Sequence, residues 1–396
     1  MPKVNRLVSI DALRGVVMIV MALDHVRDFF HRAAMSSSPT DLRVTTPLLF
    51  MTRWVTHICA PVFMLTAGLG AYFYWQAGRR TKAQLSWFLL TRGAWLIVLE
   101  LTLMQLAYNF DIASKYPIFL LVLWVLGACM VALSALVWLP LPFLLGFSGA
   151  TIVLHHLFDS VTARSFGTWA PIWYLLHQVG AFPFAGRIFI AAYPLVPWVA
   201  VMALGFCLGP VFLKPAATRQ RTLIGVGTGM TIAFLIIRAL NGYGDPAPWS
   251  PQPSPTLSAM SFLNTTKYPP SLAFLLMTLG PALLILGIFE GLAFQRKNPL
   301  IVFGRVPLFY FVLHFFVAHA AAVLLAAAVY GRTAWTFMLQ PVPSMGGPAA
   351  AFPPHFGYEL WVTYLVWIVI VAGLYPLCAW FARIKEQRRA WWVSYL

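Results

Sequence analysis

The stretch SIDALRGVVMIVMALDHVRDFF, residues 9–30, is apolar enough for a membrane helix and nevertheless contains several ionisable side chains. These are Asp11, Arg14, Asp24, His25, Arg27 and Asp28. A charged group at the centre of a bilayer costs on the order of 3 kcal/mol, so such groups normally face a bundle interior or a wet cavity. The stretch therefore predicts a membrane helix whose charged face lines an internal site.

Four of these side chains fall on one face of the predicted helix. Arg14 and His25 are separated by close to three whole turns, which places them about 16 Å apart on the same face. Asp11 lies one turn before Arg14, and Asp28 lies one turn after His25. The sequence thus predicts a polar stripe along the first helix.

The outer end of this stripe suggests acid–base chemistry. His25 is a candidate general base, and the carboxylate of Asp24 or Asp28 is expected to orient its imidazole ring. Arg27 is expected to point elsewhere and to reach the outer interface through its flexible stem. The alternative interpretation is purely structural, with ion pairs joining Asp11 to Arg14 and Asp28 to Arg32.

The rest of the chain has the composition of a membrane protein. Of its 396 residues 60% are hydrophobic and 10% are charged, whereas soluble domains carry charge on about a quarter of their residues. Apolar runs of spanning length occur at 7–30, 47–76, 85–107, 118–138, 141–158, 188–212, 222–241, 270–291, 306–330 and 358–382. We therefore predict an all-α polytopic membrane protein with about ten helices in one domain, residues 1–396.

The distribution of Lys and Arg predicts the orientation. Most of the basic residues beside the apolar runs fall on the side of the N-terminus, so both termini are expected to be cytoplasmic. This pattern also explains the net charge of +16 without nucleic-acid binding. The long connections fall on the outer side, which suggests a working surface there: they are 31–46, 159–187, 242–269 and 331–357.

Cysteine and histidine spacing gives no metal signature. The four cysteines lie singly in apolar runs, without the CxxC spacing of a zinc site. They are Cys59, Cys129, Cys207 and Cys378. His155 and His156 are adjacent, which is poor ligand geometry on a helix. We expect no bound metal.

Two segments on the outer side are candidates for binding an acceptor. Arg53, Trp54 and His57 open the second predicted helix, with Arg53 and His57 on one face. Lys267 and Tyr268 precede the eighth predicted helix. An aromatic ring can stack on a sugar, and basic groups can bind its hydroxyls or a developing oxyanion. Interface anchoring and proline-directed helix starts are the structural alternatives.

Basic residues on the inner side are candidates for the phosphates of a nucleotide-like donor, because clustered Arg and Lys suit phosphate oxygens. They are Arg79, Arg80, Arg296, Lys297 and Arg305. The orientation rule for basic residues explains them equally well. Further along, His314 is a candidate cavity residue.

Other charged residues within the apolar runs are expected to be structural. Arg92 and Glu100 are eight positions apart and are expected to form an ion pair facing inward. Arg238 has few charge partners in its own helix. A carboxylate elsewhere is expected to balance it.

The ordered motifs resemble a known family. RLVSIDALRG at 6–15 and ALDHVRDFF at 22–30 are similar to bacterial members of the heparan-alpha-glucosaminide N-acetyltransferase catalytic-domain family, within the acyltransferase-3-like membrane acyltransferases. Further matching strings are TRWVTHICAPVFMLTAG at 52–68, KYPPSL at 267–272, FGRVPLFY at 303–310 and the C-terminal WWVSYL. The resemblance spans nearly the whole chain.

This resemblance implies an enzyme that moves an acyl group, acetyl in the named family, from cytoplasmic acyl-CoA to an acceptor on the outer side. For a bacterial protein we expect the cytoplasmic (inner) membrane and a hydroxyl or amine on an envelope sugar or glycolipid. Asp11 and Arg14 would shape the donor channel. Both His25 and His31 are candidates for the base, and either direct transfer or an acyl-histidine intermediate is compatible with the sequence.

Two other functions are compatible with a charged first helix. A proton-coupled secondary transporter would use the Asp, His and Arg stripe as a relay, and a membrane scaffold would need no chemistry. The sequence has no detectable internal repeat of the kind found in many transporters, which disfavours the first. The bilayer and an acceptor are the expected partners, and an oligomer is compatible with the sequence.

Overall fold

The structure is a computed structural model that describes residues 7–78, 80–111 and 116–387. Helices account for 73% of it, which confirms the predicted mostly helical membrane protein. Within the described residues, seven helical segments are long and apolar enough to cross a membrane: Pro47–Gln76, Lys82–Asn109, Leu141–Phe158, Ala216–Leu240, Leu272–Glu290, Pro307–Met345 and Leu360–Gln387.

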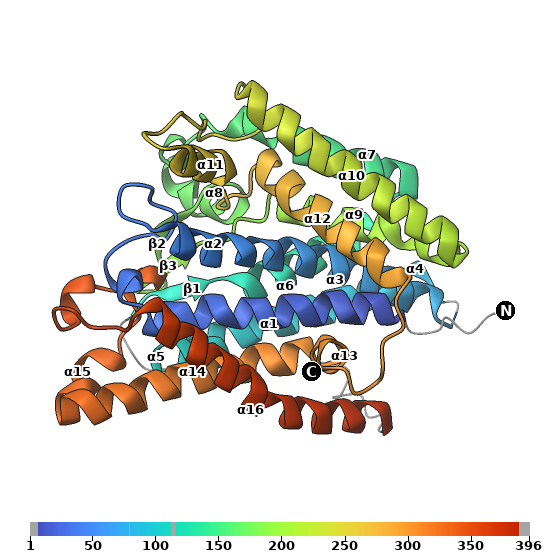
Figure 1. The fold of residues 1–396 in the computed structure, drawn as a ribbon. Helices are drawn as coiled ribbons and strands as arrows, with labels where there is room; N and C mark the ends of the chain where they lie inside the picture. Colours follow the sequence, from blue (N-terminus) through green and yellow to red (C-terminus); the bar gives the residue numbers. More distant parts are fainter. Residues whose placement is uncertain (1–6, 79, 112–115, 388–396) are drawn as a thin grey trace.

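Helix α1 (Val8–Phe30) lies at the centre of the bundle (Figure 1). It packs against α3 (Cys59–Gln76), α12 (Leu272–Glu290), α13 (Pro299–Arg305), α14 (Pro307–Tyr330) and α16 (Leu360–Gln387). We call the end of the bundle near Phe30 the outer end and the end near Val8 the inner end. Because α1 has neighbours on every side, its charged side chains face protein.

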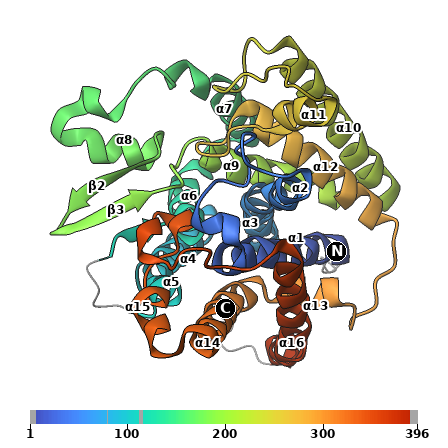
Figure 2. The same ribbon diagram turned by 60° about the vertical axis from the view of Figure 1, so that its left-hand side comes forward.

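The remaining helices are α2 (Pro47–Val55), α4 (Lys82–Leu99), α5 (Gln105–Asn109), α6 (Val122–Leu136), α7 (Leu141–Leu154), α8 (Ala170–Leu176), α9 (Trp198–Leu208), α10 (Ala216–Leu240), α11 (Pro255–Leu263) and α15 (Ala334–Met338). Three of the ten predicted runs correspond to α1 and to the shorter apolar helices α6 and α9. The short elements α8, α11 and α15 gather at the outer end (Figures 1 and 2).

A small sheet at the outer end was not predicted. Strands β1 (Ile118–Leu120), β2 (Gly180–Phe184) and β3 (Arg187–Ala191) are ordered β1-β3-β2, with β1 parallel and β2 antiparallel to β3. The runs predicted as helices from 118 and 188 therefore begin with strands. Ala185 and Gly186, both with positive φ, form the tight hairpin turn between β2 and β3, as primed turns require. The high apolar content of both segments hid this turn.

Close backbone contact fixes α13 against α1. A Cβ atom on Gly304 would lie 1.8 Å from the carbonyl oxygen of Asp11, and one on Gly15 would lie 1.8 Å from that of Leu300. Small residues let membrane helices approach in this way. The FGR segment at 303–305 is thereby held beside the first turns of α1, which places Arg305 next to the polar stripe.

Candidate active site

A pair of histidines lies toward the outer end of α1. The Nδ1 atom of His25 is 2.7 Å from the Nε2 atom of His314 on α14, and the two rings are stacked with centroids 5.0 Å apart. His314 is fully buried. The rings of Phe311 and Phe315 pack against His25, with centroids at 6.1 and 4.1 Å. The pair thus lies in a largely apolar environment where a hydrogen bond between rings is strong.

The hydrogen bonds around this pair define the tautomers of both rings. His314 Nδ1 is 2.9 Å from the carbonyl oxygen of Tyr310, which can only accept, so His314 Nδ1 carries the proton. In neutral His314, Nε2 is then an acceptor, and the proton shared with His25 belongs to His25 Nδ1. Neutral His25 therefore keeps its lone pair on Nε2. A histidine held in this tautomer can accept a proton from a substrate.

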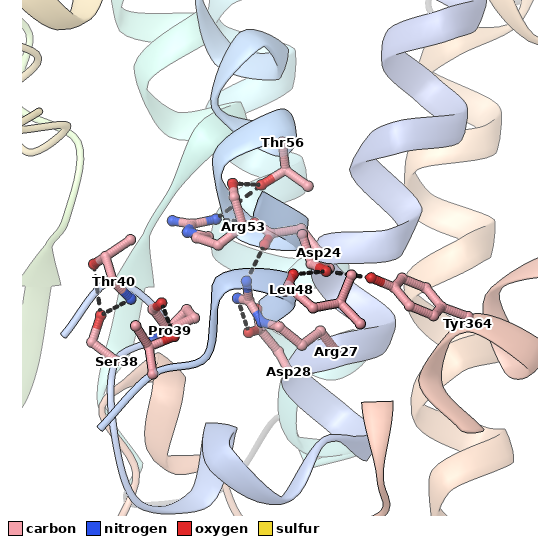
Figure 3. A network of polar contacts seen from close by, with 12 residues as sticks. Asp24, Arg27, Asp28, Ser38, Pro39, Thr40, Leu48, Arg53, Thr56 and Tyr364 are labelled. Atoms are coloured by element: carbon pink, nitrogen blue, oxygen red, sulfur yellow. Dashed lines mark hydrogen bonds and ion pairs between the residues drawn. The ribbon is translucent and has the colours of Figure 1, made fainter. Parts of the chain in front are cut away.

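The carboxylates beside His25 are engaged with arginines (Figure 3). Asp24 forms ion pairs with Arg27, at 2.8 Å, and with Arg53 of α2. Arg27 also contacts Asp28 at 2.7 Å. The prediction that Arg27 reaches the outer interface is therefore wrong: its side chain is buried, because two carboxylates in the bundle attract it more strongly than water outside.

This network changes the expected roles of Asp24 and Asp28. The side chain that hydrogen-bonds the ring of His25 is His314 rather than either carboxylate. Asp24 instead links α1 to α2 through Arg53. Asp28 is paired with Arg27, and the expected partner Arg32 forms an ion pair with Glu359 at 3.1 Å. The two carboxylates thus position the arginines around the histidine.

His31 lies away from the histidine pair, just after α1 ends. Its Nδ1 accepts a hydrogen bond from the Ala33 backbone at 3.2 Å, as the cap of a short 3-10 turn. Burial, together with the positive charge of Arg27, lowers the pKa of His31. The geometry therefore favours His25 over His31 as the base.

The predicted acceptor residues fall into two groups. Arg53 reaches Tyr268, with 3.4 Å between its Nη2 and the phenol oxygen, and the hydroxyl groups of Tyr268 and Tyr193 are also 3.4 Å apart. Trp54 and His57 instead pack against α12: Trp54 donates to the sulfur of Met277, and the buried ring of His57 lies 5.3 Å from that of Phe274. Trp54, near the end of α2, and His57, in the turn that follows it, thus pack against α12.

Lys267 is a second cation beside this tyrosine pair. Its Nζ lies 5.1 Å from the ring centre of Tyr268 and 6.0 Å from that of Tyr193, and its residue is 9% exposed. Burial by itself raises the pKa of Tyr268, but Lys267 and Arg53 outweigh burial and lower this pKa to about 8. A local positive potential therefore exists at the outer end, within electrostatic range of His25.

A cavity of about 830 Å³ extends from the inner end toward the histidines. Gln84, Arg305 and Lys385 line it at the inner end, and Met18, Leu123 and Phe311 line it deeper in the bundle. The ring of Phe311 contacts both histidines, with centroid distances of 6.1 Å to His25 and 5.7 Å to His314. Phe311 is thus both a wall of the cavity and a neighbour of the two histidines.

The cationic residues of this cavity only partly match the prediction. Arg14 and Arg305 line it, and Arg305 lies 3.9 Å from the carboxylate of Asp11. Arg80 folds onto Tyr74, a lining residue. Arg296 and Lys297 are exposed and are not among the lining residues, and Arg79 lies outside the described residues. Two lining cations were not predicted for this role: Arg92 and Lys385.

Glu100 and Arg92 have different partners and do not form the predicted ion pair. The carboxylate of Glu100 accepts hydrogen bonds from the Tyr108 hydroxyl at 2.8 Å and from the backbone N–H groups of Leu123 and Trp124. It thereby caps the first turn of α6, whereas Arg92 lines the cavity. The predicted ion pair between them is replaced by this cap, because the unpaired N–H groups of a buried helix start need an acceptor.

Arg238 is stabilised by backbone carbonyls. Its guanidinium donates to the carbonyl oxygens of Ala247, Ser261, Phe262 and Asn264. Three of these acceptors lie at the C-terminal end of α11, which carries partial negative charge. Electrostatic attraction to Asp245 adds to this. The carboxylate that was expected to bind Arg238 directly is therefore replaced by a helix end.

One group of side chains has distances suited to a metal ion: His155, His156 and Asp159 have ligand atoms within 4.8 Å of one another. However, His156 Nε2 accepts the backbone N–H of Leu272 at 3.0 Å. Its Nδ1 must then carry the proton that it shares with Asp159 at 2.6 Å, and a protonated nitrogen cannot bind a metal. The group is better described as a hydrogen-bonded clamp between the end of α7 and the start of α12.

The fold and site together define a polytopic membrane protein in which a hydrogen-bonded histidine pair packs against Phe311, a wall of a cavity that is also lined by cationic residues. A family model described as heparan-alpha-glucosaminide N-acetyltransferase, catalytic, matches residues 6–238, more than half of the chain. The chain belongs to this family, and membership implies a membrane acetyltransferase rather than a transporter. No curated protein matches the sequence at a significant level. His25 and Arg53 lie within the matched region, whereas Lys267 and His314 lie beyond it.

Proposed function

We propose that this protein transfers an acetyl group from acetyl-CoA, bound from the cytoplasm, to a hydroxyl or amine of a sugar acceptor on the other side of the membrane. In this proposal ten helices cross the bilayer, with α1, α6 and α9 among them, and both termini are cytoplasmic. The inner end then faces the cytoplasm, in accord with the concentration of basic residues there. The cytoplasmic membrane is the proposed location, and a glycolipid or envelope glycan is the proposed acceptor.

The cavity at the inner end supports the donor side of this proposal. Its volume of about 830 Å³ is in the range of pockets that bind cofactor-sized ligands. Arg14, Arg92 and Arg305 can bind phosphate oxygens, with guanidinium geometry suited to that role. The apolar walls formed by Phe63, Phe88 and other aromatic residues suit an uncharged pantetheine arm. The thioester would then reach Phe311, next to the histidines.

The histidine tautomers support the chemistry. The acceptor O–H or N–H would give its proton to His25 Nε2 while the acceptor atom forms a bond to the thioester carbonyl carbon. The C–S bond would then break, and the leaving thiolate would take the proton back from the His25 imidazolium. Each proton and each bond is accounted for without a covalent enzyme intermediate. The hydrogen bond from His25 Nδ1 to His314 keeps the ring in the tautomer that this sequence of steps requires.

The single observation that carries the proposal is the hydrogen-bonded chain Tyr310, His314, His25 next to the deep end of the cavity. The test is release of free CoA thiol by the purified full chain with acetyl-CoA and glucosamine. We expect acceptor-dependent thiol release that His25→Ala abolishes and His31→Ala preserves. Release that is absent in the wild type, or equal in wild type and His25→Ala, would contradict the proposal.

A further inference from the structure

In the part of the chain that the structure describes, Lys267 is a buried cation without a carboxylate of its own. Only 9% of the residue is exposed. Among the described residues its ammonium group contacts the rings of Tyr193 and Tyr268 and forms no ion pair within 4.0 Å. The carboxylate that exerts an electrostatic effect from nearby is Asp24, and it is already paired with Arg27 and Arg53.

The charge balance of the surrounding residues leaves Lys267 in excess. Asp24 and Asp28 neutralise Arg27 and Arg53, so this network has no net charge. Lys267 adds one positive charge at the same end of the bundle. The effect is visible on Tyr268, whose pKa falls to about 8 although burial opposes the change. A buried cation without an anionic partner is costly, and ionisable groups retained inside a membrane protein often mark the path of a substrate or ion.

Asp245 holds Lys267 in place. Its carboxylate accepts hydrogen bonds from the backbone N–H and hydroxyl of Thr266 at 2.9 and 2.8 Å, and from the hydroxyl of Ser271 at 2.7 Å. These two residues flank the turn in which Lys267 pairs with Pro270. Because the chain is tied on both sides of the turn, the backbone of Lys267 is fixed before any ligand arrives, which lowers the entropic cost of binding.

We infer that the acceptor of this enzyme carries an oxyanion, a phosphate or carboxylate group, which binds to Lys267 beside the group that receives the acetyl. The inference rests on the proposed function, because it assigns the acceptor to the outer end. Tyr268 is 37% exposed, so this location is open to a molecule arriving from outside. Arg53, 3.4 Å from the Tyr268 hydroxyl, is a second donor within reach of the same anion.

The test compares binding of glucosamine 6-phosphate and of glucosamine to the full chain in nanodiscs of zwitterionic lipid. We expect the phosphorylated sugar to bind at least about tenfold more tightly, the scale of a charge-assisted hydrogen bond. Lys267→Met should remove this preference. Lys297→Met is the matched control, because Lys297 is exposed and its loss should leave the preference unchanged.

Equal binding of the two sugars by the wild type would overturn the inference, whether or not Lys267→Met folds. A preference that survives in folded Lys267→Met would also overturn it. A third arm adds anionic lipid to the nanodiscs: if Lys267→Met alters lipid binding but not sugar binding, the anion belongs to the bilayer and the inference fails. Acetyl-CoA binding, measured on the same samples, tests the proposed function separately, because Lys267 is not among the residues that line the inner cavity.

Discussion

The two ends of helix α1 present opposite kinds of environment. At the outer end, Asp24, Arg27 and Arg53 form a closed ion-pair network around a pair of hydrogen-bonded histidines. Near the inner end, Arg14 and Arg305 line a cavity of about 830 Å³ whose walls include several aromatic side chains. One end fixes a few groups in a single geometry, and the other leaves room for a large ligand. A single helix therefore contributes both to the histidine pair and to the cavity.

This contrast explains why charged groups are tolerated in an apolar helix. Each charged residue of α1 faces either an ion-pair partner or the cavity, so none has to be solvated by lipid. A substitution is therefore expected to have different consequences at the two ends of α1. Breaking a paired network leaves a buried charge without a partner, whereas altering a cavity wall changes mainly the fit of a ligand.

Replacing the proposed base should have the largest effect. His25→Ala removes the only proton acceptor of the histidine pair with a free lone pair, and general base catalysis contributes about 10²–10⁴-fold. We expect acetyl transfer to fall by about 10³-fold while acetyl-CoA still binds. Turnover and equilibrium binding of acetyl-CoA, measured on the same preparation, check this. His31→Ala, in the same region of the chain, should retain most of the activity, and an equal loss in both variants would contradict the assignment.

Replacing His314, the hydrogen-bond partner of His25, should lower turnover less than replacing His25. His314→Ala removes the acceptor that holds His25 Nδ1–H, and we expect turnover to fall by about 10²-fold because the ring loses its fixed tautomer. His314→Gln offers an amide oxygen in a similar place and should restore part of the rate. The ratio of kcat values for the two variants is the measurement. If both variants fold and kcat of His314→Gln is no higher than that of His314→Ala, the hydrogen bond to His25 does not contribute to catalysis.

Filling the cavity should weaken donor binding. Gly70 lines the cavity, and a Cβ atom there would approach only Arg14, at 3.5 Å. Gly70→Trp should therefore fold and raise the KM for acetyl-CoA by about tenfold, since the new ring occupies ligand volume. Gly149→Trp is the matched control, because a Cβ at Gly149 meets nothing within 4 Å. Unchanged KM in the Gly70 variant would place the donor elsewhere.

Ionisation of Tyr268 should produce the smallest effect. Because the pKa of Tyr268 is lowered to about 8, this phenol is neutral below pH 8 and becomes a phenolate above it. An anionic acceptor would then be repelled, so we expect its affinity to fall several-fold as the pH rises through 8. Ultraviolet absorbance of tyrosinate follows the ionisation, and Tyr268→Phe should remove both the signal and the pH dependence. If the affinity of Tyr268→Phe still falls as the pH rises through 8, the ionisation of another group is responsible.

Hydropathy predicts the helical part of the fold well, because each apolar run must be buried in lipid or protein. The run predicted at 306–330 becomes α14, Pro307–Tyr330. The β2–β3 hairpin escaped prediction because its strands are as apolar as the helices around it, and only the Ala185–Gly186 turn distinguishes them.

The site is predictable only where its geometry is local. The helical spacing of Arg14 and His25 follows from α1 alone. The partner of His25, in contrast, lies 289 positions away, and no pattern in the sequence pairs the two residues. Arg92 was misassigned for the same reason, because the cavity that it lines is formed by distant helices. Arg27 instead pairs with Asp24 and Asp28 of its own helix. Lys267 was recognised as a site residue, but its lack of a carboxylate partner becomes visible only in three dimensions.

The proposed reaction requires that the donor enters at the inner end and that the acetyl group leaves at the outer end. Sealed right-side-out membrane vesicles loaded with labelled acetyl-CoA, which does not cross bilayers, test this directly when glucosamine 6-phosphate is supplied outside. We expect labelled N-acetylated sugar in the external medium, and almost none from His25→Ala vesicles. Label that stays inside, or product that forms equally well in His25→Ala vesicles, would contradict it.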